Sequence, residues 1–216
     1  MGKKGFFSAK RITGLAVLLA LVIVLQVALG QVKIGATSFS LVLIPIVLGG
    51  ILYGPIAGGL LGFVFGFIVL MYGVTGADPF TAIMFNDHPF WTSVICIGKG
   101  TAAGLVAGVL YKVVAKKNVY AATFVAAAVA PMVNTGLFIV GALCFLQDTI
   151  TTNFLTSGST MIYFLFIGCA GINFLIEFAV NLIASPSIYR VINIIEGKRP
   201  RKKSEEQTNK DEKTEI

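Results

Sequence analysis

The chain has 216 residues, of which 56% are hydrophobic and only 12% are charged, and its mean hydropathy is +0.87. This composition excludes a water-soluble globular domain and indicates a polytopic membrane protein. The net charge of +7 does not indicate nucleic-acid binding, because the basic residues cluster at the ends of apolar segments and in the C-terminal tail. The cysteines lie in apolar segments without the spacing of a disulfide framework or a zinc site.

The N-terminal half of the chain predicts three membrane spans. The uncharged run over residues 12–32 has the ~20 residues that a helix needs to cross the hydrocarbon. After Lys33, a long uncharged stretch predicts two shorter spans over 38–52 and 56–73, separated by a turn at Gly54 and Pro55, where glycine and proline break the helix. Residues 74–89 predict a structured loop with an amphipathic turn at the membrane interface.

The C-terminal half predicts three further spans, over residues 90–113, 120–146 and 161–184. Pro131 is expected to kink the fifth span, and Pro186 is expected to end or bend the sixth. The segment between these two spans, 147–159, is polar and predicts a loop. The tail alternates basic and acidic residues without an apolar period, which predicts a disordered cytoplasmic extension.

These elements predict an all-α polytopic membrane protein with six transmembrane helices. Residues 1–11 form a cytoplasmic N-terminus, 12–195 the six-helix membrane domain and 196–216 the charged tail. With both termini inside, fifteen basic residues lie on the inner side and Lys33 alone lies on the outer side, which fits the positive-inside rule. We therefore expect a multi-pass protein of a cell membrane, embedded in the lipid bilayer.

Three polar residues of the sixth span, Asn173, Glu177 and Asn181, are spaced four apart and fall on one helix face. An ionisable glutamate in a membrane helix must face protein or water. By depth, Asn173 is the better pocket candidate. Glu177 is either the pocket floor or a buried packing partner, and Asn181 is expected to be structural or to lie at the inner interface.

Lys99 is the one basic residue in the interior of a predicted span, ~12 Å along the helix from Trp91 at 1.5 Å per residue. At this depth its ammonium needs an anionic or strongly polar partner. That partner is either a ligand carboxylate or phosphate or the side chain of Glu177, with snorkelling as a third reading. Asn134 follows Pro131 and either repairs the broken backbone locally or binds a ligand. Trp91 and Phe39 lie near the outer interface, where aromatic residues serve as anchors or contact a ligand.

Small residues recur every four positions in two spans, at Gly54, Gly58, Gly62 and Gly66, and at Gly100, Gly104 and Gly108. Such rows let helix backbones approach closely, either within the chain or against another subunit. Several motifs are absent from the sequence. It has no P-loop, no GxSxG nucleophile and no H-E-x-x-H motif, so we expect neither an enzyme nor a bound metal or cofactor.

Three features occur together over residues 8–195: six predicted helices with both ends cytoplasmic, an Ala-x-x-x-Ala row at Ala16 and Ala20, and a compact Gly/Pro-rich turn within 45–59. In this combination the chain resembles the substrate-binding S component of energy-coupling factor (ECF) vitamin transporters. The resemblance implies a bacterial plasma-membrane protein that captures a water-soluble vitamin or precursor from outside. It also implies delivery inward with a membrane T component and two cytoplasmic ATPases, with Ala16 and Ala20 matching the contact motif for the T component.

The family's pocket opens outward among spans four to six. This implies that the substrate-binding residues are Lys99, Asn134, Asn173 and Glu177, with lid groups among Trp91, Phe39, Gln147 and Asp148. A pocket lysine favours an anionic cargo such as pantothenate, whereas a glutamate-dominated site would favour a cationic one such as thiamine. Two other classes stay open: a solitary secondary transporter that uses Lys99 and Glu177 as a proton-responsive pair, and a membrane enzyme acting on lipid.

Overall fold

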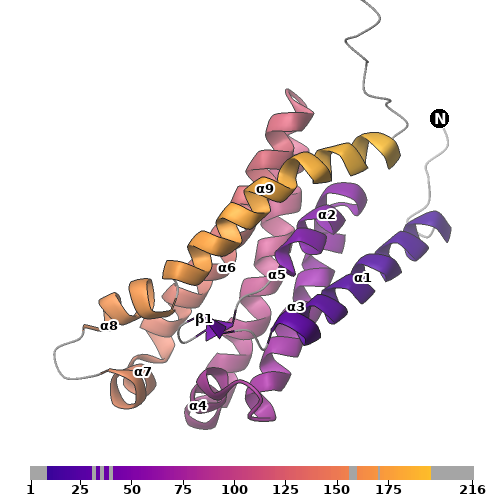
Figure 1. Ribbon diagram of the computed structural model, residues 1–216. Coiled ribbons are helices and arrows are strands. Elements are labelled where there is room, and N and C mark those ends of the chain that lie inside the picture. The colour runs from indigo at the N-terminus through magenta and orange to yellow at the C-terminus, as the bar shows by residue number, and fades with distance from the viewer. Residues whose placement is uncertain are drawn as a thin grey trace, which may run out of the picture.

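The computed structural model describes residues 9–30, 33–34, 37–38, 41–155, 160–169 and 171–195. Their elements, in chain order, are α1 (Ala9–Leu29), β1 (Lys33–Ile34), β2 (Thr37–Ser38), α2 (Leu43–Tyr53), α3 (Pro55–Val74), α4 (Pro79–Asp87), α5 (Pro89–Val114), α6 (Val119–Phe145), α7 (Gln147–Phe154), α8 (Met161–Tyr163), the π-helix η1 (Phe164–Cys169) and α9 (Gly171–Ile195). The long helices form a bundle (Figure 1). The start of α1 and the end of α9 lie at one end of it, and α4, α7 and the β1–β2 hairpin lie at the other.

Five stretches of the described chain are long and apolar enough to cross a membrane: α1, α3, α5, α6 and the stretch Met161–Ile195. The second predicted span corresponds to α2, which has only 11 residues. At 1.5 Å per residue it is ~16 Å long, about half of the ~30 Å hydrocarbon thickness. The predominantly helical membrane fold is therefore confirmed, while the count of six full spans is not established.

Two segments predicted to lie outside the spans contain short helices. Within 74–89, the expected amphipathic turn is α4, whose N-cap Asp78 accepts a hydrogen bond from the Thr81 amide at 3.2 Å, with Pro79 in the first helical turn. The expected loop after residue 146 instead begins with α7. Here the prediction of a loop was wrong, because a polar segment at the membrane surface can form a helix whose few apolar residues, such as Ile150, pack inward.

The last membrane stretch also differs from an uninterrupted helix ending near residue 184. It starts as α8, widens into η1, and continues as α9 through Pro186 to Ile195. The expectation that Pro186 could end the helix is wrong, since α9 runs nine residues beyond it. A π-helical turn changes the register of the side chains that follow it. In this chain, η1 directly precedes the polar residues of α9.

The glycine rows of α3 and α5 pack against one another within the chain. A Cβ built on Gly58 would lie 2.6 Å from the carbonyl oxygen of Gly104, and one built on Gly100 would lie 2.5 Å from that of Gly62. Only glycine permits this approach of two backbones. Gly66 meets the Cys96 carbonyl in the same way, so the seam fixes the register of the two helices.

Candidate functional site

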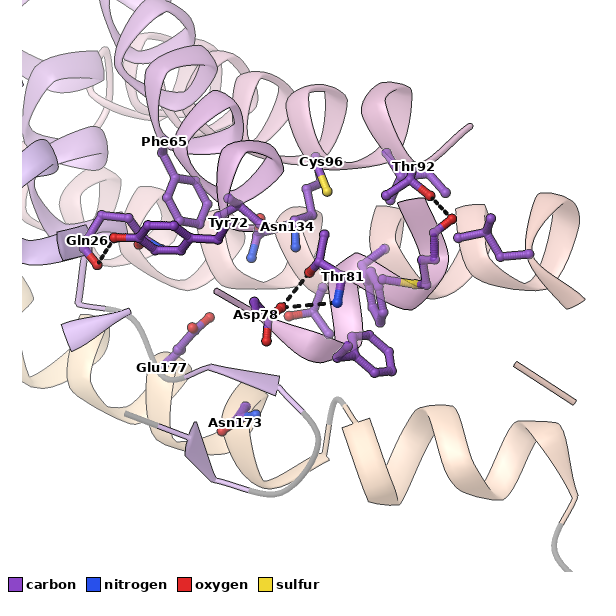
Figure 2. A pocket seen from close by; sticks show the side chains of 18 of the residues that line it. Gln26, Phe65, Tyr72, Asp78, Thr81, Thr92, Cys96, Asn134, Asn173 and Glu177 are labelled. Atoms are coloured by element: carbon purple, nitrogen blue, oxygen red, sulfur yellow. Dashed lines mark hydrogen bonds between the residues drawn. The ribbon is translucent and has the colours of Figure 1, made fainter. Parts of the chain in front are cut away.

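A pocket lies between the helices, toward the end of the bundle that holds α4 and α7 (Figure 2). The empty space between its lining atoms is about 890 Å³, including the part open to solvent. Its described lining residues come from six helices and from two positions between helices. From the helices they are Gln26 of α1; Phe65, Val69 and Tyr72 of α3; Phe80, Thr81 and Met84 of α4; Thr92, Ile95, Cys96 and Lys99 of α5; Asn134, Thr135 and Phe138 of α6; and Asn173, Phe174 and Glu177 of α9. The two positions between helices are Asp78 and Leu146.

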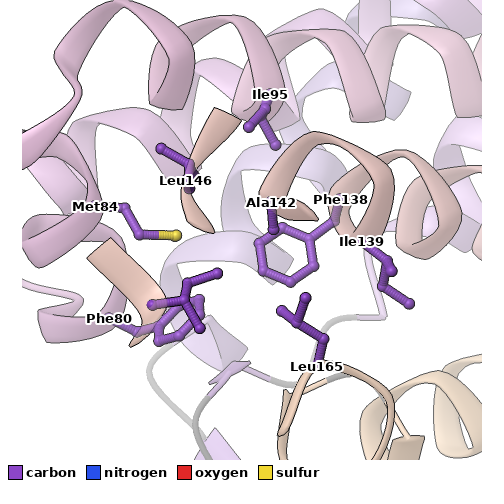
Figure 3. Close-up of a cluster of buried hydrophobic side chains, with 9 residues drawn as sticks. Phe80, Met84, Ile95, Phe138, Ile139, Ala142, Leu146 and Leu165 are labelled. Atoms are coloured by element: carbon purple, nitrogen blue, oxygen red, sulfur yellow. The ribbon is translucent and has the colours of Figure 1, made fainter. Parts of the chain in front are cut away.

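A buried apolar cluster forms one wall of the pocket and links α4, α5 and α6 to the start of α7 (Figure 3). Phe80 is central to it, with ring centroids 6.0 Å from Phe138 and 4.9 Å from Phe154. Phe80 of α4 thus lines the pocket at this end, and Phe154 of α7 packs against it. Their polar sides also meet, because the Asn153 amide donates to the Asp87 carboxylate at 3.3 Å.

Lys99 lies on α5 in the pocket, one turn beyond the point where Gly66 of α3 contacts the Cys96 carbonyl. Its ammonium lies 5.1 Å from the centroid of the Phe138 ring, which is a cation–π contact. Among the described residues, Lys99 forms no ion pair, so the structure does not contain the Lys99–Glu177 pair that was one reading of the sequence. The ammonium is therefore held at the pocket by an aromatic face and keeps its hydrogen-bond donors for another group.

Asn134 faces the same space from α6. Its side chain is 7% exposed, and its Oδ1 atom accepts no hydrogen bond from any described residue. A buried amide oxygen without a donor costs free energy, ~1–3 kcal/mol, unless a ligand or water supplies one. Helix α6 continues through Pro131 three residues earlier, so the proline positions Asn134 without ending the helix.

The polar residues of α9 separate into two groups. Asn173 and Glu177 are each 6% exposed and line the pocket, on the side opposite Cys96 and Asn134 in Figure 2. Asn181 is fully buried outside the pocket, and its amide donates to the backbone carbonyl of Glu177 at 2.8 Å. The structure thus places Asn173 and Glu177 at the pocket and gives Asn181 a local backbone partner.

The sequence did not single out Asp78 as a pocket residue, yet it lines the pocket and is only 7% exposed. Its Oδ2 atom accepts from the Thr81 amide at 3.2 Å and from the Thr81 hydroxyl at 2.5 Å. The Asp-Pro pair before an apolar turn is a helix-start pattern that would have predicted this capping role. On α5, the Thr92 hydroxyl similarly donates to the Met84 carbonyl at 2.8 Å and ties α5 to α4.

Gln26 and Tyr72 close the side of the pocket between α1 and α3. Gln26 is 2% exposed, and the Tyr72 hydroxyl donates to its backbone carbonyl at 3.3 Å. Their meeting in the pocket depends on how α1 crosses α3, for which the sequence has no pattern.

The predicted lid residues that the structure describes, Trp91, Gln147 and Asp148, are not among the described lining residues of the pocket. Trp91 stacks on Phe145, with centroids 3.7 Å apart and planes inclined by 9°, and it is not among the described lining residues. Gln147 and Asp148 are exposed at the start of α7. Phe39 lies outside the described residues.

The predicted partner-contact residues, Ala16 and Ala20, lie on an exposed face of α1. Large apolar side chains share that exposure, with Val17 at 56% and Val24 at 60%. Of the five long stretches, α1 has the smallest buried share, 17% of its most apolar window. Helix α1 therefore presents most of its surface to lipid or to a partner.

Among the described lining residues, the charged side chains are one ammonium, Lys99, and two carboxylates, Asp78 and Glu177. They stand among aromatic and aliphatic side chains, an arrangement that suits binding and orientation of a small polar molecule. In the part of the chain that the structure describes, no group of three or more His, Cys, Asp or Glu side chains could hold a metal ion.

Comparison with known families matches residues 10–189 to the ECF transporter substrate-specific component. No curated protein was found that matches the chain. The family match includes all or most of every helix that contributes to the pocket and ends within α9. The chain is a substrate-specific component of the ECF transporter family, and hence a substrate-binding membrane subunit of a transport system.

Proposed function

We propose that this subunit binds a water-soluble vitamin or vitamin precursor in the pocket between α3, α5, α6 and α9, and that the ligand carries an anionic group held by Lys99. The supporting observation is the environment of Lys99. Its ammonium lies at the pocket, and among the described residues it contacts the Phe138 ring. A ligand carboxylate or phosphate would provide the opposite charge that a cation at this depth requires.

The remaining polar groups favour a ligand that also carries hydrogen-bond donors. The Asn134 Oδ1 atom can only accept a hydrogen bond, and no described residue donates one to it. A molecule such as pantothenate, which joins a carboxylate to hydroxyl and amide groups, fits this combination, with the carboxylate toward Lys99 and a donor toward Asn134.

The proposed cycle needs partners. The ligand enters from the outer side, at the end of the bundle with α4 and α7, and is released inside with a membrane T component and two ATPases. The exposed face of α1 around Ala16 and Ala20 is the proposed contact with the T component. Small side chains there would let a partner helix approach closely. The alternative of a solitary proton-driven transporter has less support, because the Lys99–Glu177 pair on which it depended is not formed.

Ligand binding to the purified protein tests the role of Lys99. Lys99→Met removes the ammonium and keeps a chain of similar length, and Lys117→Met, at an exposed position outside the pocket, is the matched control. A charge-assisted hydrogen bond contributes ~1.5–3 kcal/mol, so pantothenate affinity should fall roughly 10- to 100-fold in Lys99→Met and stay unchanged in Lys117→Met. Tight thiamine binding that Lys99→Met leaves unaltered would contradict the proposed ligand class.

A further inference from the structure

A second hollow lies at the opposite end of the bundle, between the α2–α3 turn and the connection from α5 to α6. The empty space between its lining atoms is about 990 Å³, including the part open to solvent. Its described lining residues are Gly50, Ile51, Leu52, Gly54, Pro55, Gly108, Tyr111, Lys112, Ala115, Lys116 and Val119. We call it the inner groove, because it lies at the end of the bundle where α1 begins and α9 ends (Figure 1). The substrate pocket shares none of these residues.

The inner groove is cationic. Lys112 and Lys116 both line it and are both exposed, and no Asp or Glu is among its described lining residues. The two lysines are four residues apart, so they lie on the same side of the chain where α5 ends. Lys117 is also exposed beside them but does not line the groove.

Glycines form part of the wall of the inner groove. A Cβ built on Gly54 would meet no atom within 4 Å, which shows that the space beside the α2–α3 turn is unfilled. Gly108 forms part of the wall, and a Cβ there would lie 2.7 Å from the Cα atom of Pro55. The α5 backbone therefore passes close to the turn, and the lysines project beside a hollow whose walls are backbone and small side chains.

An apolar stripe leads along the membrane surface of α5 to the two lysines. Leu105, Val109 and Val113 are 36%, 47% and 57% exposed. With Lys112 they follow helical spacings and so share one face of α5, and Lys116 follows in the turn just after the helix ends. The surface thus changes from apolar to cationic where the groove begins. A phospholipid in a leaflet has the matching order, with an apolar acyl chain followed by a charged headgroup.

We propose that the inner groove binds the phosphate headgroup of an anionic phospholipid, with an acyl chain along the Leu105–Val109–Val113 stripe. Basic pockets between membrane helices on the cytoplasmic side are suited to anionic headgroups, and two lysines supply the charge that one phosphodiester needs. The lipid would link the α2–α3 turn to the end of α5. The proposal does not depend on which ligand occupies the substrate pocket, because the two sites have no residue in common.

Native mass spectrometry of the full chain, released from bilayers that contain equal amounts of phosphatidylglycerol and phosphatidylcholine, tests the site. The wild-type protein should retain phosphatidylglycerol selectively. Each lysine near a charged membrane surface contributes about fivefold in affinity, so Lys112→Gln/Lys116→Gln should lower retention by roughly 25-fold. Lys117→Gln, which removes a neighbouring charge outside the groove, should retain the lipid as the wild type does.

A second variant tests the cavity independently of charge. Ala115→Leu adds volume at a lining position, keeps both lysines, and should also reduce retention of phosphatidylglycerol. Equal retention of both lipids by the wild type, or an equal loss in Lys117→Gln and the double variant, would overturn the proposal and indicate bulk attraction of lipid. Displacement by millimolar inorganic phosphate with no requirement for acyl chains would assign the groove to a free phosphate compound, and would also overturn it.

Discussion

The seam between α3 and α5 makes a quantitative prediction for two glycines that are two positions apart on α5. A Cβ on Gly100 would lie 2.5 Å from the Gly62 carbonyl oxygen and 3.0 Å from the Phe65 ring, whereas a Cβ on Gly98 would meet no atom within 4 Å. Ordinary contact begins at 3.4 Å, so Gly100→Ala must separate the two backbones by about 0.9 Å. Both substitutions gain the same ~1 kcal/mol of helix propensity, so the difference in stability between the two variants isolates the steric cost.

Overpacking of this kind costs ~1–3 kcal/mol, so Gly100→Ala should be less stable than Gly98→Ala by about that amount. For a chain of this size the gap corresponds to unfolding temperatures that differ by roughly 2–12 °C. Thermal unfolding in detergent can be followed by the fluorescence of Trp91, the single tryptophan, which stacks on Phe145. Equal unfolding temperatures for the two variants would refute the backbone seam.

Three further predictions follow from the contacts described above. Ala16→Trp should abolish uptake into vesicles that contain the complete transporter while ligand binding to the isolated subunit persists, and undiminished uptake would exclude this face of α1 as the partner contact. Asn134→Leu should weaken binding of pantothenate about tenfold, because ~1–1.5 kcal/mol is lost with one hydrogen bond. Isothermal titration measures this affinity, and an unchanged value would show that Oδ1 faces no ligand. Asn181→Leu removes the donor to the Glu177 carbonyl outside the pocket. The unfolding temperature should therefore shift while the dissociation constant for pantothenate stays the same. A loss of affinity without loss of stability would contradict the structural role of Asn181.

Much of the bundle could be predicted from the sequence because apolar length and glycine spacing are local properties. The predicted span over 56–73 is α3, and the one over 120–146 is α6, each within a residue or two of the observed ends. The rows at Gly62 and Gly100 were read as close packing within the chain or against another subunit, and the structure places them against each other. A membrane helix with one small-residue face leaves few other ways to bury that face.

The second predicted span was placed less well, for a physical reason. Hydropathy locates apolar residues but does not say whether they cross the bilayer, and the uncharged run after Lys33 was long enough for a span over 38–52. The structure begins α2 at Leu43 and ends it at Tyr53, so part of that apolar run lies outside the helix. Helix α2 packs against α3 and α5, and this packing stabilises a helix that would be too short to be stable alone.

The polar residues of the pocket differ in how strongly their place in the pocket depends on tertiary structure. Lys99, Asn134, Asn173 and Glu177 stand out because a polar side chain in a membrane helix must be met by protein, ligand or water, and all of them line the pocket. Asp78 did not stand out, because an aspartate between spans is ordinary in a loop. Its entry into the pocket depends on α4 folding back over the bundle, which is a long-range property.

Transport by the reconstituted protein tests the central claim most directly. Vesicles that hold this subunit alone, and vesicles that also hold a T component and two ATPases, would be compared for uptake of labelled pantothenate with ATP inside. Uptake should require the partners and ATP, and the Lys99→Met subunit should lose it while Lys117→Met retains it. Uptake by the subunit alone, driven by a proton gradient and indifferent to ATP, would contradict the account.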